Sequence, residues 1–296
     1  MSASGTPTNR TNIDLPVEVS SEIIKKTQEA SAVMQLARQI ALPGNGAAIP
    51  VITSYPEAAW VGETGKKPVS NPGLDTKIIR AYKLAVLVPF SNEFTRDAAS
   101  LYDALIDSLP NALGAKFDNT VFGGTQAPGS DFDTFASVTA RDLDTDAYGA
   151  LVAADTDIAV HGGIVNGYAL SPQARGILLS ATDKNGRPLF INSVAEGAVP
   201  VILGSKTYQS TGAYIQGNPD TVGFVGDWTK ALWGTVEGVK IDISDQASIA
   251  YTDALGQPAV INLFQDNMIA VRAEIEVGFR ADTDVFNALT SSSISA

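Results

Sequence analysis

The fold that we expect for this chain is decided by residues 47–90, AAIPVITSYPEAAWVGETGKKPVSNPGLDTKIIRAYKLAVLVPF. Two extended segments, 47–54 and 77–90, flank a tip of turn-forming residues at 62–75. The returning segment alternates, with Ile78, Tyr82, Leu84, Val86 and Val88 on one side and Lys77, Ile79, Ala81 and Lys83 on the other. A long two-stranded hairpin has no core of its own. Its apolar side chains must therefore lie against the body of the same chain or against a neighbouring subunit.

Helical periodicity lies on both sides of this hairpin. Residues 1–12 are small and polar and predict an extended arm, and apolar residues three or four apart predict a helix over 15–40. A second apolar stripe predicts a long helix over 91–121. Its members are Phe94, Ala98, Leu101, Leu105, Leu109, Leu113, Phe117 and Val121. Because Pro110 removes a backbone donor and clashes with the preceding turn, we expect a bend near 106–110 or two abutting helices.

The second half of the chain alternates helix and strand signals. Asp146 predicts the cap of a short helix to residue 153, and Ser171 followed by proline predicts a helix that ends near residue 180. Short strands are expected at 158–160, 168–170, 199–203, 221–225 and 238–243. A final strand has Ile269, Val271, Ala273, Ile275, Val277 and Phe279 on one face and Ala270, Arg272, Glu274, Glu276 and Arg280 on the other. The helix over 91–121 is the expected cover for its apolar face.

These elements predict a mixed α+β chain. At 296 residues it can bury a substantial core. We expect an N-terminal arm at 1–46, an extended hairpin at 47–90, one domain formed by 91–145 with 246–296, and an α+β domain at 146–245 inserted into it.

Composition limits the partners and the chemistry. The net charge is −12 without a block of lysine and arginine, which argues against tight sequence-independent binding of nucleic acid. The chain has no cysteine, so disulfides, thiolate nucleophiles and zinc–thiolate sites are excluded. It starts without a secretory signal pattern, and no apolar run approaches the roughly 20 residues of a membrane helix.

The hairpin is positive within a negative chain. Residues 57–83 carry a net charge of +2, whereas 141–160 carry −4 and 240–296 carry −5. We interpret the small excess as a partner for the acidic surface of a neighbouring subunit rather than for DNA. The expected intersubunit contact residues are Trp60, Glu63, Lys66, Lys67, Lys77 and Arg80.

Motifs for catalysis are weak or missing. His161, the only histidine, precedes two glycines, which favours a turn, and no G-x-S-x-G motif accompanies it. The GETGKK sequence at 62–67 lacks the spacing of a phosphate loop and the Ser or Thr after its lysine. We therefore expect no catalytic residue and no cofactor.

Two further residue groups could suggest a ligand. Asp142, Asp144 and Asp146 match the first positions of a calcium loop, but alanine stands where glycine and the bidentate glutamate are needed. Helix capping and a solvated turn are the better interpretation, so no metal site is expected. Trp60, Trp228 and Trp233 could stack on ligands, but packing in a core or an interface is the commoner role of such residues.

Five segments in a fixed order carry a family resemblance. They are AAWVGETGKKP at 58–68, LVPFSNEFTRDA at 87–98, ALSPQARGILLSATDKNGRPLF at 169–190, VGDWTKALWGTVEGVKIDIS at 225–244 and FQDNMIAVRAEIEVGFRADTDVFNAL at 264–289. Each is short, but in this order they resemble the extended loop, the start of the spine helix, the axial domain and the closing peripheral strand of tailed-bacteriophage major capsid proteins. This family has the Hong Kong ninety-seven-like fold.

The resemblance implies the phage capsid fold, with an N-terminal arm, an extended β-hairpin loop, a long spine helix, a peripheral β-sheet domain and an inserted axial domain. It implies a subunit without enzymatic activity that forms hexamers and pentamers in an icosahedral head around double-stranded DNA, which it encloses without specific binding. Scaffolding, portal and decoration proteins are the other implied partners, and no membrane is. Assembly would take place in the host bacterial cytoplasm, and the final location would be the virion.

Two departures from the family pattern affect these expectations. Many relatives begin with a long scaffolding segment, whereas the recognisable fold here starts close to Met1, so that segment has been removed or a separate protein supplies the scaffold. Some relatives cross-link through a lysine–asparagine bond, and Lys66, Lys67 and Lys77 lie in the corresponding loop without a matching asparagine or acid. An encapsulin-type nanocompartment shell shares the fold and is the alternative function, and a carbohydrate- or protein-binding β module is a more distant one.

Overall fold

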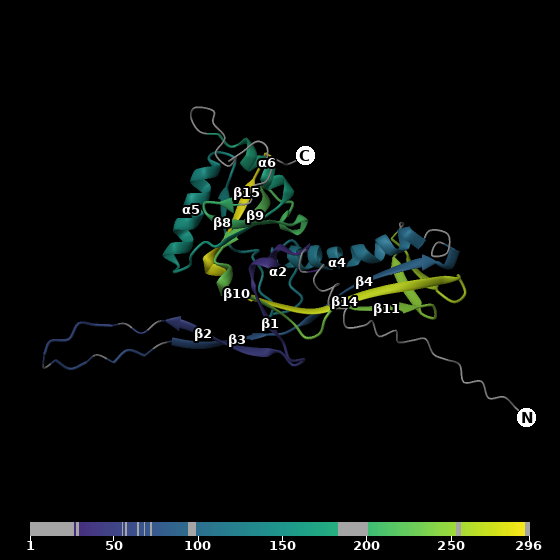
Figure 1. Ribbon diagram of the computed structural model, residues 1–296, viewed down its shortest axis with the longest axis horizontal. Coiled ribbons are helices and arrows are strands. Elements are labelled where there is room, and N and C mark those ends of the chain that lie inside the picture. The colour runs from purple at the N-terminus through teal and green to yellow at the C-terminus, as the bar shows by residue number, and fades with distance from the viewer. Residues whose placement is uncertain are drawn as a thin grey trace, which may run out of the picture.

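The computed structural model describes residue 27 and residues 30–54, 56, 58–63, 65–67, 69–71, 73–93, 99–182, 201–252 and 256–293. Two bodies, each built on a β-sheet, lie side by side, and a hairpin projects away from them along the long axis of the molecule (Figure 1). The helices and strands combine in the mixed α+β manner that the sequence predicts.

The first sheet collects strands from four parts of the chain. Its centre is β14 (Met268–Ala281), and β4 (Tyr82–Ser91) pairs antiparallel along one side of it. On the other side lie β10 (Ala231–Thr235) and β11 (Lys240–Ser244), and β1 (Arg38–Ala41) pairs in parallel with β10. The predicted apolar face of β14 is confirmed, because Val271, Ala273, Ile275, Val277 and Phe279 are all buried.

The long helix α4 (Ala99–Val121) covers this face, as the sequence predicts. Phe117 of α4 lies edge-on to Phe279 of β14, with ring centroids 6.3 Å apart. Leu109, Leu113 and Val121 of the stripe are also buried, and the side chains of its earlier members lie outside the described residues. The helix is continuous through Pro110, so the alternative of two abutting helices is wrong within α4. The bend stays a prediction.

The second sheet forms the other body (Figure 1). Its strands, in order across the sheet, are β5 (Thr139–Asp142), β15 (Phe286–Ser291), β9 (Asp220–Gly226), β6 (Gly167–Leu170), β8 (Ser205–Gln209) and β7 (Val201–Ile202). Helix α5 (Ala147–Val160) packs on β5, β9 and β15, and α6 (Pro172–Ser180) packs on β6 and β9. The Ser171 hydroxyl caps α6 and Pro172 opens it, which confirms the predicted helix.

One aromatic core joins the two sheets. The ring of Phe135 stacks on Phe286 of β15 with centroids 4.4 Å apart, and it lies 5.6 Å from Phe279 of β14. Phe122, just after α4, stacks on Phe224 of β9 at 4.5 Å. Such large rings dominate the apolar area that folding removes from water. The two sheets therefore form one folding unit.

Two antiparallel pairs of strands stand apart from both sheets. The projecting hairpin consists of β2 (Ala47–Ser54) and β3 (Gly73–Ile79), and a second ribbon consists of β12 (Ser248–Thr252) and β13 (Pro258–Asn262). The remaining described elements are α2 (Ala32–Leu36) and the single turns η1 (Thr211–Ala213), η2 (Trp228–Lys230) and η3 (Thr283–Val285).

Two predicted elements are wrong in whole or in part. The helix expected over 15–40 lies mostly outside the described residues and is confirmed over α2. Its last part, residues 38–40, is instead the strand β1, because pairing with β10 overrides the local helical preference. The strand expected at 158–160 is the end of α5, which continues well past residue 153. Leu151, Ala154 and Ile158 are buried at helical spacing, and a three-residue apolar run cannot distinguish a strand from a helix.

The returning arm of the hairpin is not one strand. β3 ends at Ile79, and β4 then joins β14 in the first sheet. Before the break at Arg80, the predicted faces are reversed, because Ile79 is buried and Ile78 is 42% exposed. After the break, the two faces of the strand are as predicted. A shift of one residue moves every side chain of a strand to the opposite face.

The expected domain boundaries do not follow the strand pairing. β10 and β11 lie within 146–245, but they pair with β14 in the first sheet. β5 and β15, expected with the first sheet, belong to the second. The chain passes back and forth between the two sheets, so neither sheet corresponds to the blocks of sequence that were expected to form the domains.

Candidate assembly interface

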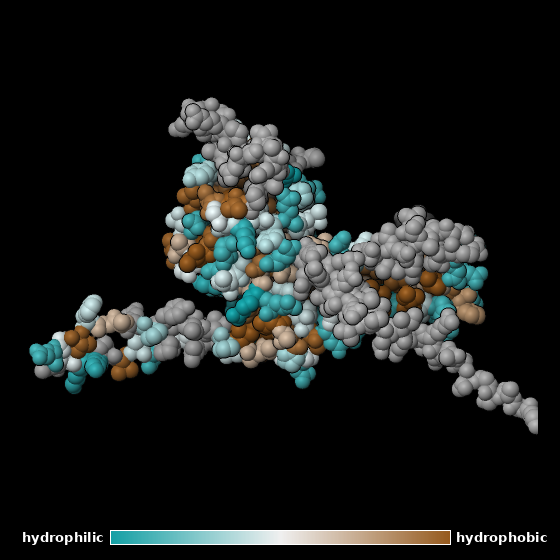
Figure 2. Space-filling model, in the orientation of Figure 1, coloured by the Kyte–Doolittle hydropathy of each residue, from teal (hydrophilic) through white to brown (hydrophobic). Residues whose placement is uncertain are grey.

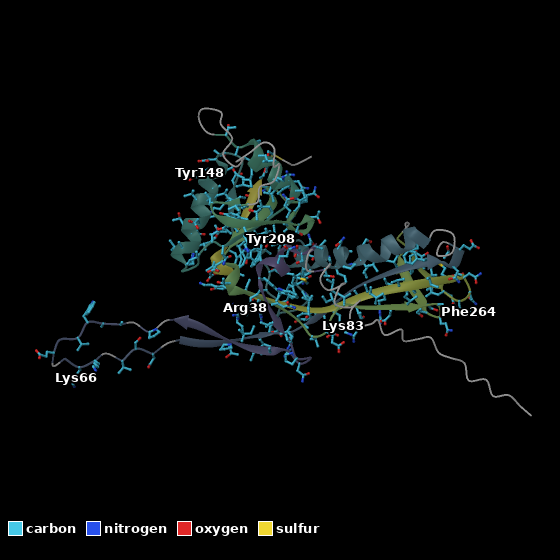
Figure 3. The ribbon with its side chains drawn as sticks, in the orientation of Figure 1. Arg38, Lys66, Lys83, Tyr148, Tyr208 and Phe264 are labelled. Atoms are coloured by element: carbon cyan, nitrogen blue, oxygen red, sulfur yellow. The ribbon has the colours of Figure 1, made fainter. Side chains whose placement is uncertain are left out.

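The tip of the projecting hairpin exposes both apolar and charged side chains. Trp60 is fully exposed, Val69 is 88% exposed, and hydrophobic patches are visible along the projection (Figure 2). Glu63, Lys66 and Lys67 are exposed as well, and Lys66 lies near the far end of the projection (Figure 3). Within the described part of the chain, neither lysine forms an ion pair. The tip therefore presents an uncovered tryptophan beside two unpaired positive charges.

The base of the hairpin, in contrast, is held by its own chain. The ammonium group of Lys77 donates to the carbonyl oxygen of Ala281 at 3.1 Å, and Arg80 pairs with Asp131 at 3.4 Å. The guanidinium group of Arg280 donates to the carbonyl oxygen of Ile78 at 2.7 Å and to Asp131 at 3.3 Å. Of the six predicted contact residues, Lys77 and Arg80 thus lie at the anchored base and the other four lie at the tip.

Sequence reasoning missed the residues that anchor this base. Arg280 also donates to Asp133 at 2.6 Å, and its side chain is only 13% exposed. The alternation of the last strand placed Arg280 on the polar face, and no predicted helix or strand contained Asp131 or Asp133. No local signal in the sequence joins residues almost 150 positions apart.

A buried carboxylate joins the N-terminal arm to the long helix. Asp118 of α4 accepts hydrogen bonds from the Ser31 hydroxyl at 2.5 Å and from the backbone N–H groups of Ala32 at 2.8 Å and Val33 at 3.3 Å. The Ser210 side chain is another hydrogen-bond partner. Burial raises the pKa of Asp118 to about 6, although these hydrogen bonds act in the opposite direction. The contact fixes the position at which the arm reaches the fold.

The ribbon β12–β13 and the turn after it also carry exposed apolar side chains. Val260 is 68% exposed, Tyr251 is 45% exposed, and Phe264 in the turn after the ribbon is 76% exposed. Asp245 and Asp266 beside them are exposed too. An isolated two-stranded ribbon is marginally stable in water. Like the hairpin, it has the character of a contact surface.

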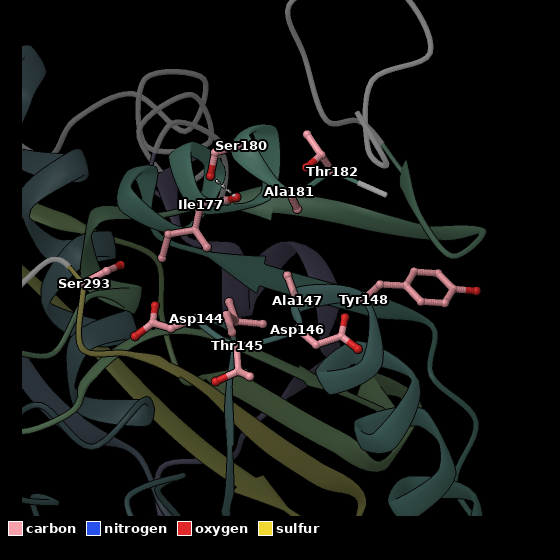
Figure 4. Close-up of a pocket in the computed structure, with 11 residues that line it drawn as sticks. Asp144, Thr145, Asp146, Ala147, Tyr148, Ile177, Ser180, Ala181, Thr182 and Ser293 are labelled. Atoms are coloured by element: carbon pink, nitrogen blue, oxygen red, sulfur yellow. Dashed lines mark hydrogen bonds between the residues drawn. The ribbon is translucent and has the colours of Figure 1, made fainter. Parts of the chain in front are cut away.

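The acidic loop before α5 has a structural role. Asp146 caps α5 by accepting from the N–H of Gly149, and Asp142 accepts from the N–H of Asp144, so the predicted capping and turn are confirmed. Asp144 lines a cavity of about 340 Å³ between the ends of α5 and α6 (Figure 4). A hydrogen bond from the Ser291 hydroxyl holds the pKa of Asp144 below its usual range. Among the described residues, no group of acidic and histidine side chains could hold a metal ion.

The other candidate residues lie where the sequence places them. His161 is the exposed residue that ends α5, in the predicted turn. Trp228 and Trp233 are buried in the core, and only Trp60 among the tryptophans is exposed. No helix in the described ranges is long and apolar enough to cross a membrane.

Comparison with known proteins identifies the family. The model of the phage capsid family matches residues 13–284. A protein of Mycobacterium phage L5, named "Probable major capsid protein gp17", is 30% identical over 297 residues, which cover 94% of this chain and 89% of that protein.

The chain belongs to the phage capsid family.

Further relatives support the assignment of this chain to the phage capsid family. The major capsid protein of Staphylococcus phage 80alpha is 25% identical over 279 residues, which cover 90% of this chain and 81% of that protein. A solved structure from Mycobacterium phage Adephagia has a TM-score of 0.71 at 20% identity, and it covers 88% of this chain and 90% of that one. The predicted capsid fold is confirmed.

The function of this capsid protein follows from the family. It is a major capsid protein, a structural subunit of the shell of the phage head and so a component of the virion. The encapsulin alternative is not favoured, because the matching proteins are phage capsid proteins across nearly the whole length of the chain.

Proposed function

We propose that this capsid protein assembles with itself, as hexamers and pentamers, into an icosahedral head that encloses double-stranded DNA, and that it catalyses no reaction. The supporting observation is the projecting hairpin, whose base is anchored by its own chain and whose tip is uncovered. A fully exposed tryptophan on a projection from a folded body is costly in water unless a partner covers it. In a shell, the nearest partner is another copy of the same chain.

The proposed contact residues divide into two roles. Trp60, Glu63, Lys66 and Lys67 at the tip touch the neighbouring copy, while Lys77 and Arg80 at the base fix the direction of the projection. An exposed ion pair contributes only about 0–1 kcal/mol, but the same contact recurs many times in a closed shell. Small individual energies therefore suffice for assembly.

Other parts of the proposal follow from the charge and the family. DNA is enclosed without affinity, because the chain is strongly acidic. Scaffolding, portal and decoration proteins are the proposed further partners, and the host bacterial cytoplasm is the proposed site of assembly. We assign the first sheet with α4 to the peripheral domain and the second sheet with α5 and α6 to the axial domain.

The proposal is tested by shortening the hairpin. Deleting residues 62–75 removes Glu63, Lys66 and Lys67 of the tip but keeps Trp60 and the anchored base, so the circular dichroism spectrum and the melting temperature of the subunit should stay close to those of the full chain. Negative-stain images should then show no shells, whereas the full chain forms them under the same conditions.

A matched pair of point variants tests whether assembly depends on the hairpin tip or on any exposed apolar side chain. Trp60→Ala should weaken assembly, whereas Val160→Ala, which changes another exposed apolar residue at the end of α5, should leave it unchanged. Normal shells from the deletion variant would refute the proposed role of the hairpin.

A further inference from the structure

Three parts of the chain meet at the buried carboxyl group of Asp118. Asp118 lies on α4, and the arm segment, which is residue 27 with residues 30–36, provides it with three hydrogen-bond donors. Ser210, which follows β8 of the second sheet, provides a fourth. The carboxyl group therefore holds both the arm segment and the second body against α4.

Two glycines bring these segments directly onto α4. A Cβ atom at Gly114 would lie 3.0 Å from the carbonyl oxygen of Thr27, on the arm segment. A Cβ atom at Gly212, in the turn η1, would lie 2.6 Å from the carbonyl oxygen of Ala115. Contacts this close exclude water from the surface of α4 between them. Asp118 is accordingly fully buried.

No positive charge compensates this carboxyl group from the segments packed against it. Residues 30–37 and 210–213 contain no charged side chain. On α4 itself, the nearest charged residue is Lys116, which is exposed. Lys25 and Lys26 precede the arm segment and lie outside the described residues. Burial is the largest influence on the carboxyl group, and a buried charge without a cation is costly.

The arm segment can open without the rest of the fold. Its helix α2 has five residues, lies beside α4 (Figure 1), and belongs to neither sheet. Segments outside the central sheets open at a lower free energy than the sheets themselves. Opening would expose Asp118 to water and return its pKa towards the ordinary value of 3.8.

We propose that Asp118 is a proton-dependent latch, whose protonation tightens the docking of the arm segment on α4. This conformational device goes beyond the proposed function and does not rest on it. The protonated group still accepts through its carbonyl oxygen, and its O–H can donate to a serine hydroxyl. The neutral form thus keeps the contacts and removes the buried charge.

The sign and the size follow from the two protonation equilibria. The pKa of Asp118 is about 6 when the arm segment is docked and near 3.8 when water reaches the group. A proton therefore binds more tightly to the docked form, and docking strengthens as the pH falls. The docking equilibrium constant should rise about tenfold from pH 7 to pH 5.

Hydrogen exchange of unassembled subunits measures this docking. In a peptide that covers residues 31–37, the protection factor, corrected for the intrinsic exchange rate at each pH, should be about tenfold higher at pH 5 than at pH 7. Asp118→Asn should reduce this ratio to less than about twofold. The matched control Asp155→Asn, at an exposed position on α5, should keep the ratio of the original chain.

A second variant distinguishes proton binding from a purely structural contact. Ser210→Ala leaves every contact of the arm segment with Asp118 in place, but it removes a hydrogen bond that lowers the pKa of the carboxyl group. The rise in protection should then begin at a higher pH. A purely structural contact would change the protection by the same factor at every pH.

Three results would overturn the inference. The first is a tenfold ratio that persists in Asp118→Asn. The second is equal protection of residues 31–37 and of a peptide from β14 at each pH, because the arm segment would then open only with the whole chain. If Asp118→Asn does not fold, Ser210→Ala decides, and an unchanged pH profile in that variant is the third.

Discussion

Replacing Asp118 by asparagine should remove a specific pH dependence from the stability of the subunit. This carboxyl group is fully buried, and its pKa is about 6 in the folded chain against 3.8 for the ordinary group. The folded state therefore binds a proton more tightly than the unfolded state between these two values. Stability falls as the pH rises from about 4 to about 6, and above that range this group changes nothing further.

The size of the effect follows from the shift. A difference of about two pKa units corresponds to about 3 kcal/mol, since each unit contributes about 1.4 kcal/mol. Asparagine has nearly the same shape and cannot ionise. The unfolded chain is itself partly protonated at pH 4. The free energy of unfolding of the original chain, relative to that of Asp118→Asn, should thus increase by about 2 kcal/mol between pH 7 and pH 4, and by about 3 kcal/mol only at lower pH.

Urea unfolding of unassembled subunits at several pH values measures this difference. Other carboxyl groups, such as Asp144 with its lowered pKa, contribute in the opposite direction, but they are common to both chains and cancel. Asp155→Asn, the same change at an exposed position on α5, is the matched control and should leave the pH profile as it is. A difference between the original chain and Asp118→Asn that does not vary with pH would refute the reasoning.

Three shorter predictions concern the hairpin and the negative net charge of the chain. Arg280→Ala should lower the free energy of unfolding by about 2–3 kcal/mol, because Asp131 and Asp133 lose their charged donor, and Arg280→Lys should recover part of it in urea titrations. Lys66→Glu/Lys67→Glu should slow assembly measured by light scattering, with an effect that shrinks as salt is raised from about 0.1 M to about 1 M. Gel shifts of subunits with DNA at about 150 mM salt should show no micromolar binding, and a micromolar affinity would contradict the charge argument.

Local signals explain which elements could be predicted from the sequence. The helix α6 was found with its start at the predicted position, because Ser171 and Pro172 are both start signals and lie next to each other in the chain. The strand β14 and its cover by α4 were found because the two periodicities are long and unbroken. In each case the information lies within the element itself.

Long-range pairing explains what could not be predicted. Nothing near residues 38–41 indicates that they lie beside residues 232–235, and that pairing makes them a strand. Asp118 is one polar residue in an amphipathic helix, and only the approach of the arm at Ser31 and of the turn at Ser210 buries it. The hairpin tip was predicted as a contact from its composition, but its anchoring by Arg280 depends on the folded chain.

The short link between β3, which ends at Ile79, and β4, which begins at Tyr82, has a mechanical consequence. β4 runs on from the hairpin along the long axis (Figure 1), and it is paired with β14 from Tyr82 to Ser91. Antiparallel hydrogen bonds lie perpendicular to their strands. A pull on the tip therefore loads this ladder in shear, so that its bonds share the force instead of opening one after another. Through β4, the hairpin is therefore attached to the first sheet in a geometry that resists stretching, while its tip remains exposed.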